Sequence, residues 1–380
     1  MSALDGLKIA DFSWVGAGPR ATKDLADNGA TVIKIESRKR LDLGRLSPPF
    51  AGGVKDPDGS AFFAQTNTSK KSVTINLTDP RGVEIAKRLV AWADVVVENF
   101  GPGFMDRIGL GYDVLKRIRP DIILASVSVA GRSGPMAGFR GYGNSAAAHS
   151  GHAALTGWPG SAPHMPPLAY GDVVAPMFAT VAILAALEHR ARTGEGQHVD
   201  VSQIEPMIHV IADLYAADPL PEKSGNDDAR FALHGVFPAQ GEDRWVAIAA
   251  RDEDQLRAVG SVLGIEGAVT QAAVAGRTAE WDRYGLADAL TATGVAASAV
   301  QDGRDVFESD ELAAGSHFVA IDHPVLKATR MPAPPYRLEA TPWSMRPAPL
   351  LGEHNRAVYV EMLGMDQDEL DALAAEGVLA

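Results

Sequence analysis

The sequence predicts an α/β protein with a mostly parallel sheet and crossover helices. Apolar, strand-like stretches alternate with helix-like stretches through the first half of the chain, which is the rhythm of β-α-β units. Residues that start and stop helices separate the two kinds of stretch. The length, 380 residues, is enough for two domains, or for one large α/β domain with an insertion.

The first half of the chain contains the expected sheet. We expect strands at residues 7–12, 31–35, 72–77, 94–98 and 122–127, with helices at 19–27, 80–92 and 112–118. Asn28-Gly29 ends the first helix, because glycine readily adopts the left-handed conformation of a helix stop. Asp79-Pro80 starts the second helix, since Asp caps free N–H groups and Pro has none to satisfy.

The second half is organised differently. Residues 132–167 are rich in Gly, Ser, Ala and Pro, which predicts loops and short helices. We expect next a long apolar helix, a further helix, a polar linker, an α+β segment and two tail helices, at residues 173–190, 203–216, 219–228, 244–321, 356–363 and 366–375.

Composition excludes several classes of function. The chain has no cysteine, so disulfides, thiolate metal sites and a cysteine nucleophile are ruled out. A formal net charge of −13 argues against nucleic-acid binding. The apolar run at 179–187 is shorter than the about 20 residues that span a bilayer, and the N-terminus lacks a signal-peptide pattern. We therefore expect a cytoplasmic protein with no membrane partner. Three histidines lack Glu or Cys at ligand spacing, so no metal site is expected at His149, His152 and His164.

A glycine-rich turn, Gly16-Ala17-Gly18, follows the first strand and opens a helix. Together with Glu36 it imitates the fingerprint of dinucleotide-binding proteins. Any tight strand-to-helix connection needs such a turn, so NAD binding is one interpretation among several.

Basic residues near two predicted strand ends favour a different anion. They are Arg38, Lys39 and Arg40 after one strand and Lys70-Lys71 before another. Each group alone is typical of a solvated surface. Together they could hold a ligand with several phosphates, such as CoA, because charge-assisted hydrogen bonds contribute about 1.5–3 kcal/mol each.

Two further motifs each have a structural and a functional interpretation. Asn99 and Phe100 are either turn and core residues, or they contact an adenine or pantetheine group. Asp172 precedes the long helix and is either its cap or a carboxylate nucleophile, which a dry pocket would make more reactive. The residues alone leave both questions open.

Taken in order, the motifs resemble CoA-transferase family III, which contains formyl-CoA transferase, carnitine and bile-acid CoA-transferases and α-methylacyl-CoA racemase. The resemblance extends over nearly the whole chain. It rests on the segments 6–12, 18–19, 29–30, 32–36, 67–72, 97–103, 105–111, 171–172, 193–197 and 350–355.

The resemblance implies an interlocked homodimer of subunits with a Rossmann-like large domain and a smaller inserted α+β domain. The large domain would comprise residues 1–224 and 323–380, and the inserted domain residues 225–322. The implied CoA contacts are Val15, Gly16 and Ala17 in the turn, Arg38 or Arg40 and Lys70 at the phosphates, and Asn99, Phe100, Arg107 and Arg140. Tyr142 and Gly171 would lie on the substrate side, and Asp172 falls on the family's nucleophile.

The implied reaction moves CoA between carboxylic acids. Asp172 attacks the thioester of a donor acyl-CoA and forms a mixed anhydride, which the CoA thiolate converts into an aspartyl-CoA thioester. An acceptor carboxylate then reverses the sequence. CoA and acyl-CoA are substrates here, and no tightly bound cofactor is implied. Segments 155–159 and 242–249 are similar to benzylsuccinate-type subunits, some of which are heteromeric. We therefore expect succinyl-CoA as donor and an aryl or alkyl dicarboxylate as acceptor.

Two departures from the family pattern argue against particular alternative functions. Racemases of this family use a histidine in a Gly-His-Asp context, where this chain has Gly141-Tyr142-Gly143, so an acyl-CoA racemase is disfavoured. The stretch 234–238 lacks the glycine run of formyl-CoA transferase, which argues against oxalate as acceptor. A non-catalytic CoA-binding subunit of a heteromeric transferase is the remaining alternative, and Asp172 argues against it.

Overall fold

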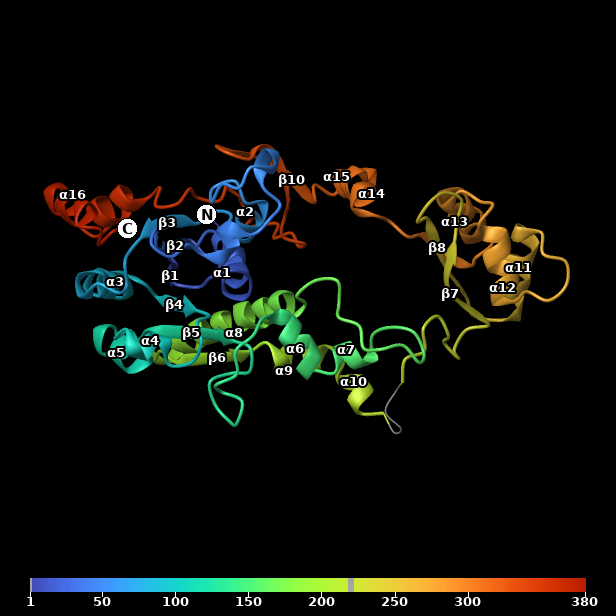
Figure 1. Cartoon of the computed structure of the whole chain (residues 1–380), viewed down its shortest axis with the longest axis horizontal. Coiled ribbons are helices and arrows are strands. Elements are labelled where there is room, and N and C mark those ends of the chain that lie inside the picture. Colours follow the sequence, from blue (N-terminus) through green and yellow to red (C-terminus); the bar gives the residue numbers. More distant parts are fainter. Residues whose placement is uncertain (1, 218–221) are drawn as a thin grey trace. The chain divides into compact units, whose positions relative to one another are not determined.

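The computed structural model describes residues 2–217 and 222–380 (Figure 1). The chain forms two compact units. The first comprises Met1–Ala153, Met165–Ala216 and Gly315–Ala380, and the second comprises Ala154–His164 and Ala217–Ala314. The expected domain boundaries, 1–224, 225–322 and 323–380, stay a prediction.

A six-stranded parallel sheet forms the centre of the first unit (Figure 1). In the order β3-β2-β1-β4-β5-β6, its strands are Lys71–Thr74, Thr31–Glu36, Lys8–Asp11, Val95–Glu98, Ile123–Ser128 and His198–Ser202. Every neighbouring pair is parallel. The strand order reverses between β1 and β4, and ligands of open α/β sheets bind at such a point, beyond the carboxyl ends of the strands.

Helices cover both faces of this sheet, as strands with two buried faces require. On one face, α1 (Ala17–Asp27) and α8 (Gly171–Thr193) pack on β1, β2, β4 and β5. On the other, α3 (Pro80–Trp92), α5 (Tyr112–Ile118) and α16 (Gln367–Ala375) contribute to a second core. Successive strand residues point to opposite faces, so Ile9 belongs to the first core and Ala10 to the second.

Shorter elements complete the connections. The short helices η1, η2, α2, α4, α6, α7, α9, α10 and η3 are Leu43–Leu46, Ala51–Gly53, Ala61–Thr66, Phe104–Arg107, Gly143–His149, His152–Leu155, Ile204–Val210, Ala212–Tyr215 and Ala357–Met362. An antiparallel hairpin in the first unit consists of β10 (Phe318–His323) and β11 (Lys327–Pro332).

The second unit has an antiparallel sheet and its own core. The sheet order is β7-β8-β9, and the strands are Leu233–Pro238, Trp245–Ala250 and Ala296–Ala299. Side chains of the strands and of three helices form the core, which includes Val246, Val259 and Leu290. The helices α11, α12, α13, α14 and α15 are Glu253–Leu263, Gln271–Thr278, Arg283–Thr291, Gly303–Glu308 and Asp310–Ala314.

The predicted fold class is confirmed, whereas one helix was predicted wrongly and some strands were missed. The helix expected at 203–216 is two short helices, because Ile211 leaves the helical conformation with φ −115° and ψ 27°. The strands β6, β7 and β11 were not expected. The tail segment 356–363 is helical as expected, and its turn η3 is π-helical.

Within the part of the chain that the structure describes, α8 alone is long and apolar enough to cross a membrane. Its inner residues Ala175, Ala179 and Ile183 are fully buried in the protein.

Candidate active site

A cavity of about 840 Å³ lies at the carboxyl ends of the parallel strands. Its lining includes Trp14 beyond β1, Ser37 directly after β2, Asn99 directly after β4, Val129 directly after β5 and Gln203 directly after β6. Carboxyl ends of parallel strands meet at one edge of a sheet, so residues far apart in sequence converge there. The volume is in the range of cofactor and substrate sites.

Asp172 lies on the wall of this cavity, at the N-terminus of α8. Glycines allow the close packing around its carboxylate. A Cβ atom on Gly16 would lie 3.2 Å from the Asp172 Cβ, and one on Gly143 would lie 2.7 Å from the Asp172 backbone N and 3.0 Å from its Cγ. A Cβ atom on Gly171 would lie 3.1 Å from the Gly143 Cα. A larger residue at Gly16 or Gly143 would crowd Asp172, and a larger residue at Gly171 would separate Gly143 from the start of α8.

Two hydrogen bonds reach the oxygens of Asp172. The Gln203 Nε2 donates to Oδ1 at 2.8 Å, and the Gly143 backbone N donates to Oδ2 at 3.4 Å. Burial raises the pKa of Asp172 above its ordinary value, while these hydrogen bonds and the charge of Arg20 act in the opposite direction. A desolvated carboxylate with few partners is more nucleophilic than one in water.

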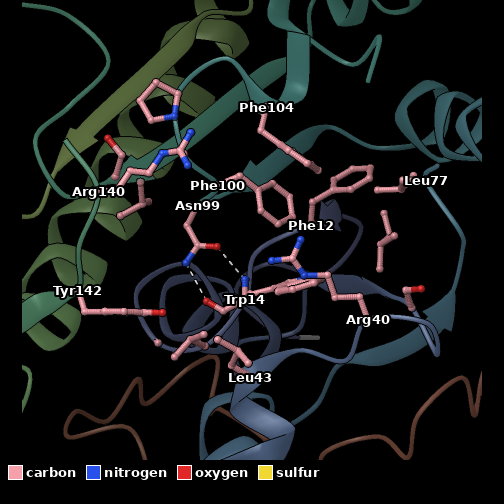
Figure 2. A pocket seen from close by; sticks show the side chains of 18 of the residues that line it. Phe12, Trp14, Arg40, Leu43, Leu77, Asn99, Phe100, Phe104, Arg140 and Tyr142 are labelled. Atoms are coloured by element: carbon pink, nitrogen blue, oxygen red, sulfur yellow. Dashed lines mark hydrogen bonds between the residues drawn. The ribbon is translucent and has the colours of Figure 1, made fainter. Parts of the chain in front are cut away.

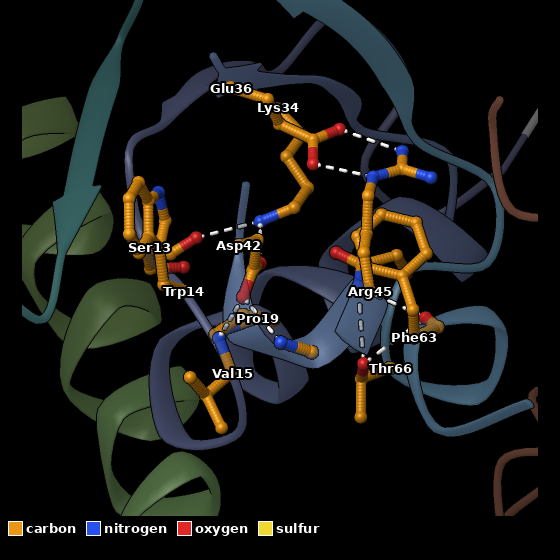
Figure 3. Close-up of polar contacts among 12 residues, drawn as sticks. Ser13, Trp14, Val15, Pro19, Lys34, Glu36, Asp42, Arg45, Phe63 and Thr66 are labelled. Atoms are coloured by element: carbon orange, nitrogen blue, oxygen red, sulfur yellow. Dashed lines mark hydrogen bonds and ion pairs between the residues drawn. The ribbon is translucent and has the colours of Figure 1, made fainter. Parts of the chain in front are cut away.

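The turn before α1 is held in an unfavourable conformation. Val15 has a φ of 63°, in the left-handed region that β-branched residues avoid. Its backbone N donates to the Asp42 Oδ1 at 2.8 Å, and the Asp42 Oδ2 lies 2.9 Å from the Lys34 Nζ (Figure 3). Both charged side chains are fully buried. This buried pair therefore fixes the turn that brings Gly16 against Asp172.

Aromatic rings and arginines form another part of the lining. The rings of Trp14 and Phe100 meet edge to face with centroids 5.7 Å apart, and Phe100 and Phe104 lie 4.6 Å apart. The guanidinium of Arg40 lies 5.5 Å from the Trp14 ring (Figure 2). That of Arg107 lies 5.9 Å from the Phe104 ring. We call these five residues the aromatic wall. Flat apolar surfaces flanked by cations suit a nucleotide base with nearby phosphates.

Asn99 holds the backbone of Trp14 in the aromatic wall. Its Oδ1 accepts from the Trp14 backbone N at 2.7 Å, and its Nδ2 donates to the Trp14 carbonyl at 2.7 Å (Figure 2). The Phe100 backbone is held similarly, because its N–H donates to Glu98 at 2.9 Å and its carbonyl accepts from Arg132 at 3.2 Å. Both peptide units of the wall are thus fixed by side chains at the ends of neighbouring strands.

Most of the predicted site residues meet in this cavity. They are Val15, Gly16, Arg40, Asn99, Phe100, Arg107, Arg140, Tyr142 and Asp172. Arg140 and Tyr142 lie on one side of it, and Arg40 lies on the opposite side (Figure 2). Ala17 is buried in the first turn of α1, and Gly171 is buried beside Asp172; neither lines the cavity.

The predicted contact of Lys70 with a phosphate needs correction. Lys70 is buried, and its Nζ donates at 2.9 Å to Asp11, to the Pro19 carbonyl and to Asn67. An ammonium has three donors, so none is left for a phosphate. Burial lowers the pKa of Lys70 to about 8, and Asp11 acts against this shift. Arg38 does not line the cavity and donates to the Leu351 carbonyl at 2.9 Å; its contact with a phosphate stays a prediction.

Sequence reasoning missed several lining residues. Gln203 contacts Asp172, and Trp14 and Phe104 form much of the aromatic wall. The position of Gln203 directly after a strand would have been a signal, but β6 was not recognised. Trp14 lies just beyond the first expected strand and could have been chosen on that ground.

Among residues 2–217 and 222–380, no group of three His, Cys, Asp or Glu side chains is placed to hold a metal ion.

The fold agrees with comparisons to known proteins. The chain belongs to CoA-transferase family III, whose family model matches residues 4–355. It is therefore a CoA-transferase, and CoA thioesters are substrates of this class.

Curated relatives cover the chain almost completely. The succinyl-CoA:glutarate CoA-transferase of Mus musculus is 31% identical and aligns with 100% of this chain and 91% of its own length. The formyl-CoA:oxalate CoA-transferase of Streptomyces coelicolor is 30% identical, with 99% of each chain aligned. A crystal structure of a CAIB/BAIF family protein from Brucella suis has a TM-score of 0.87 at 31% identity, covering 95% of this chain and 99% of its own.

Proposed function

We propose that this protein transfers CoA from succinyl-CoA to a second carboxylic acid through covalent intermediates on Asp172. The observation that carries the proposal is the position of this carboxylate. It lies on the wall of a cavity large enough for an acyl-CoA, partly buried, with glycine backbone packed around it. A helix cap needs none of these features, because a cap is stabilised at an exposed helix end equally well.

The chemistry follows from this geometry. Asp172 attacks the thioester carbonyl, and the C–S bond breaks to give a mixed anhydride and the CoA thiolate. The thiolate attacks the aspartyl carbonyl, releases the donor acid and leaves an aspartyl-CoA thioester. The acceptor acid then takes CoA by the reverse steps. Each intermediate keeps the activated acyl bond, and bound CoA provides the proximity that makes its second attack fast.

CoA is assigned to the cavity by its charge and its aromatic wall. Four cationic side chains line it in a chain of net charge −13, namely Lys39, Arg40, Arg107 and Arg140. We propose that the adenine packs against the wall near Phe100 and that the arginines pair with phosphates, while the turn at Val15 and Gly16 lies along the pantetheine. In this arrangement Asn99 holds the Trp14 backbone in place and so positions the Trp14 ring. Tyr142 borders the acyl group.

The acceptor is proposed to be a dicarboxylate. The similar protein of Mus musculus is named for succinyl-CoA and glutarate, and succinate and glutarate are both dicarboxylates.

A homodimer is proposed as the assembly, with a paralogous partner subunit as the alternative. Support comes from α8, where Met177, Phe178, Val181 and Leu184 are exposed. Such an apolar face is costly in water unless another surface covers it.

The experiment uses peptide mass spectrometry after rapid quenching of the protein with succinyl-CoA, in the presence of hydroxylamine. An aspartyl anhydride or thioester becomes a stable hydroxamate on the Asp172 peptide. The matched control is Asp172→Asn, which should give no adduct. If the wild-type protein transfers CoA to dicarboxylates without any modification of Asp172, the covalent mechanism is wrong.

A further inference from the structure

We propose that Gln203 is a catalytic residue of this transfer: its side-chain amide stabilises the oxyanion that forms on the Asp172 carboxyl group. The inference rests on the proposed function above, because it assigns a donor to intermediates formed on Asp172. It begins from a contact with a reacting atom, the hydrogen bond of 2.8 Å from the Gln203 Nε2 to the Asp172 Oδ1.

Gln203 is held rigidly at the end of the sheet. It is 5% exposed and lines the cavity directly after β6. Its backbone N donates to the carbonyls of Ser128 at 2.8 Å and Val129 at 3.0 Å, at the end of the neighbouring strand β5. A donor fixed before the reaction needs no reorganisation when charge develops, which is the requirement for oxyanion stabilisation.

The side chain has no other visible task in the part of the chain that the structure describes. Its Oε1 is buried and accepts no hydrogen bond, and the bond to Asp172 is the one hydrogen bond found for its amide. An unsatisfied buried carbonyl costs about 1–3 kcal/mol. Stability alone would favour an apolar residue of the same size, so the amide is explained by its contact with Asp172.

The two oxygens of Asp172 are held unequally, which divides their roles. Oδ1 is bound by Gln203 at 2.8 Å, whereas Oδ2 is bound by the Gly143 N–H at 3.4 Å. The less tightly held Oδ2 is the better nucleophile. In the first step its lone pair forms a bond to the thioester carbon, and the C–S electrons leave with the CoA thiolate.

Oδ1 remains as the carbonyl oxygen of the resulting anhydride. When the thiolate sulfur attacks Cγ of Asp172, the C=Oδ1 π electrons move to Oδ1, which becomes the oxyanion facing Gln203. Collapse restores C=Oδ1 and breaks the Cγ–Oδ2 bond, so the donor carboxylate leaves with Oδ2. No proton is gained or lost, and the acceptor acid repeats both steps in the opposite direction.

The first test variant is Gln203→Leu, which keeps the volume and removes the donor. We expect kcat to fall by roughly 10²–10³-fold, the loss seen when one oxyanion donor is removed, with KM for succinyl-CoA unchanged. The matched control is Gln65→Leu, a partly buried glutamine of α2 that does not line the cavity. The control should retain wild-type kcat.

A pH profile separates catalysis from structural support. Losing the hydrogen bond should move the acid limb of kcat/KM to higher pH, because the bond from Gln203 favours the ionised carboxylate. Arg20 on α1 is the charge that acts on Asp172, and Glu36, Lys39, Arg40, Arg107 and Arg140 line the same cavity. All six remain in the variant, so the movement is assigned to Gln203.

A second variant covers the case in which Gln203→Leu does not fold. Gln203→Glu keeps the shape and places a carboxylate beside Asp172, where like charges raise the pKa further. It should lose kcat near neutral pH. A wild-type kcat and acid limb in a folded Gln203 variant would overturn the inference. By contrast, a wild-type protein that never labels Asp172 would overturn the proposed mechanism itself.

Discussion

Val15 carries backbone strain at the wall of the cavity, and Asp42 is the side chain that keeps it there. A left-handed non-glycine residue costs about 1–3 kcal/mol and persists only when its surroundings determine it. Here a buried carboxylate accepts from the strained peptide and is neutralised by Lys34. The ion pair thus links the stability of the chain to the shape of the cavity.

Replacing Asp42 by Ala tests this link. The change leaves the Lys34 ammonium buried without its carboxylate, so we expect the free energy of unfolding to fall by about 3–5 kcal/mol. The freed turn should also raise KM for succinyl-CoA. Chemical denaturation and steady-state kinetics measure the two effects. The control is Asp254→Ala, whose partner Arg257 is exposed, and it should cost no more than about 1 kcal/mol. Equal losses in both variants would contradict the role of Asp42.

Asp172 gives a prediction about pH and stability. Its folded pKa is raised by burial above the ordinary value of 3.8, so ionisation disfavours the folded state. Its stabilising contribution is present below the unfolded pKa and is lost as pH rises through the folded pKa. Asp172→Asn should therefore melt at a higher temperature than the wild type at pH 7, and the difference should shrink toward a pH of about 4.

The same variant should lose roughly 10⁴-fold or more in kcat, as removal of a nucleophile does. Thermal melts at several pH values, alongside assays at neutral pH, test both statements. A variant less stable than the wild type at pH 7 would show that the carboxylate is a structural cap.

The helices α6 and α8 meet through glycines, and their contact sets the position of Asp172. A methyl group on Gly143 would lie 2.7 Å from the Asp172 backbone N. Gly143→Ala must therefore separate the two helix starts. Misplacing a reacting group by about 1 Å can cost 10²-fold in rate, and we expect a loss of kcat of that order.

Gly138→Ala is the matched control for this substitution. A Cβ atom there would meet nothing within 4 Å, so this variant should keep wild-type activity. Hydroxamate labelling of Asp172 should fall in step with kcat in Gly143→Ala. Normal labelling and kcat would mean that the contact between the helices is loose.

Elements with strong local signals were predictable from sequence. The helix α3 has the expected bounds because Asp79 and Pro80 mark its start, and Gly29 has the left-handed φ of 106° that a helix stop requires. β6 was missed because its sequence, His-Val-Asp-Val-Ser, mixes polar and apolar residues at the edge of the sheet. Pairing with β5 makes it a strand, and pairing between distant segments leaves no local pattern.

The lining of the cavity was predictable where side-chain chemistry and position in the chain coincide, as at Asp172 and Arg40. The partner of a long, flexible side chain was not predictable from sequence. A lysine beside a strand fits a phosphate or a buried carboxylate equally well, and only the fold brings Asp11 to Lys70. For the same reason Gln203 became visible only when β6 brought it to Asp172.

The assembled molecule should be larger than one chain. Light scattering coupled to gel filtration should give twice the chain mass of 40.1 kDa if the exposed face of α8 is covered by a second copy. Val181 is 66% exposed on that face, and Val181→Asp would place a charge in the interface and shift the protein toward monomers or aggregates. The control Val54→Asp, at a valine 69% exposed outside α8, should not change the mass. A wild-type monomer would refute the dimer.

Gly16 and Gly143 come from distant parts of the sequence and pack against Asp172, and Gly171, which precedes Asp172, packs against Gly143. This offers a practical criterion for reading unfamiliar sequences from genomes. A homologue with an aspartate at the nucleophile position but a bulkier residue at any of the three glycine positions would hold that aspartate out of place. Such a chain would be classified as a non-catalytic partner subunit. A chain with the aspartate and all three glycines would be classified as an active enzyme.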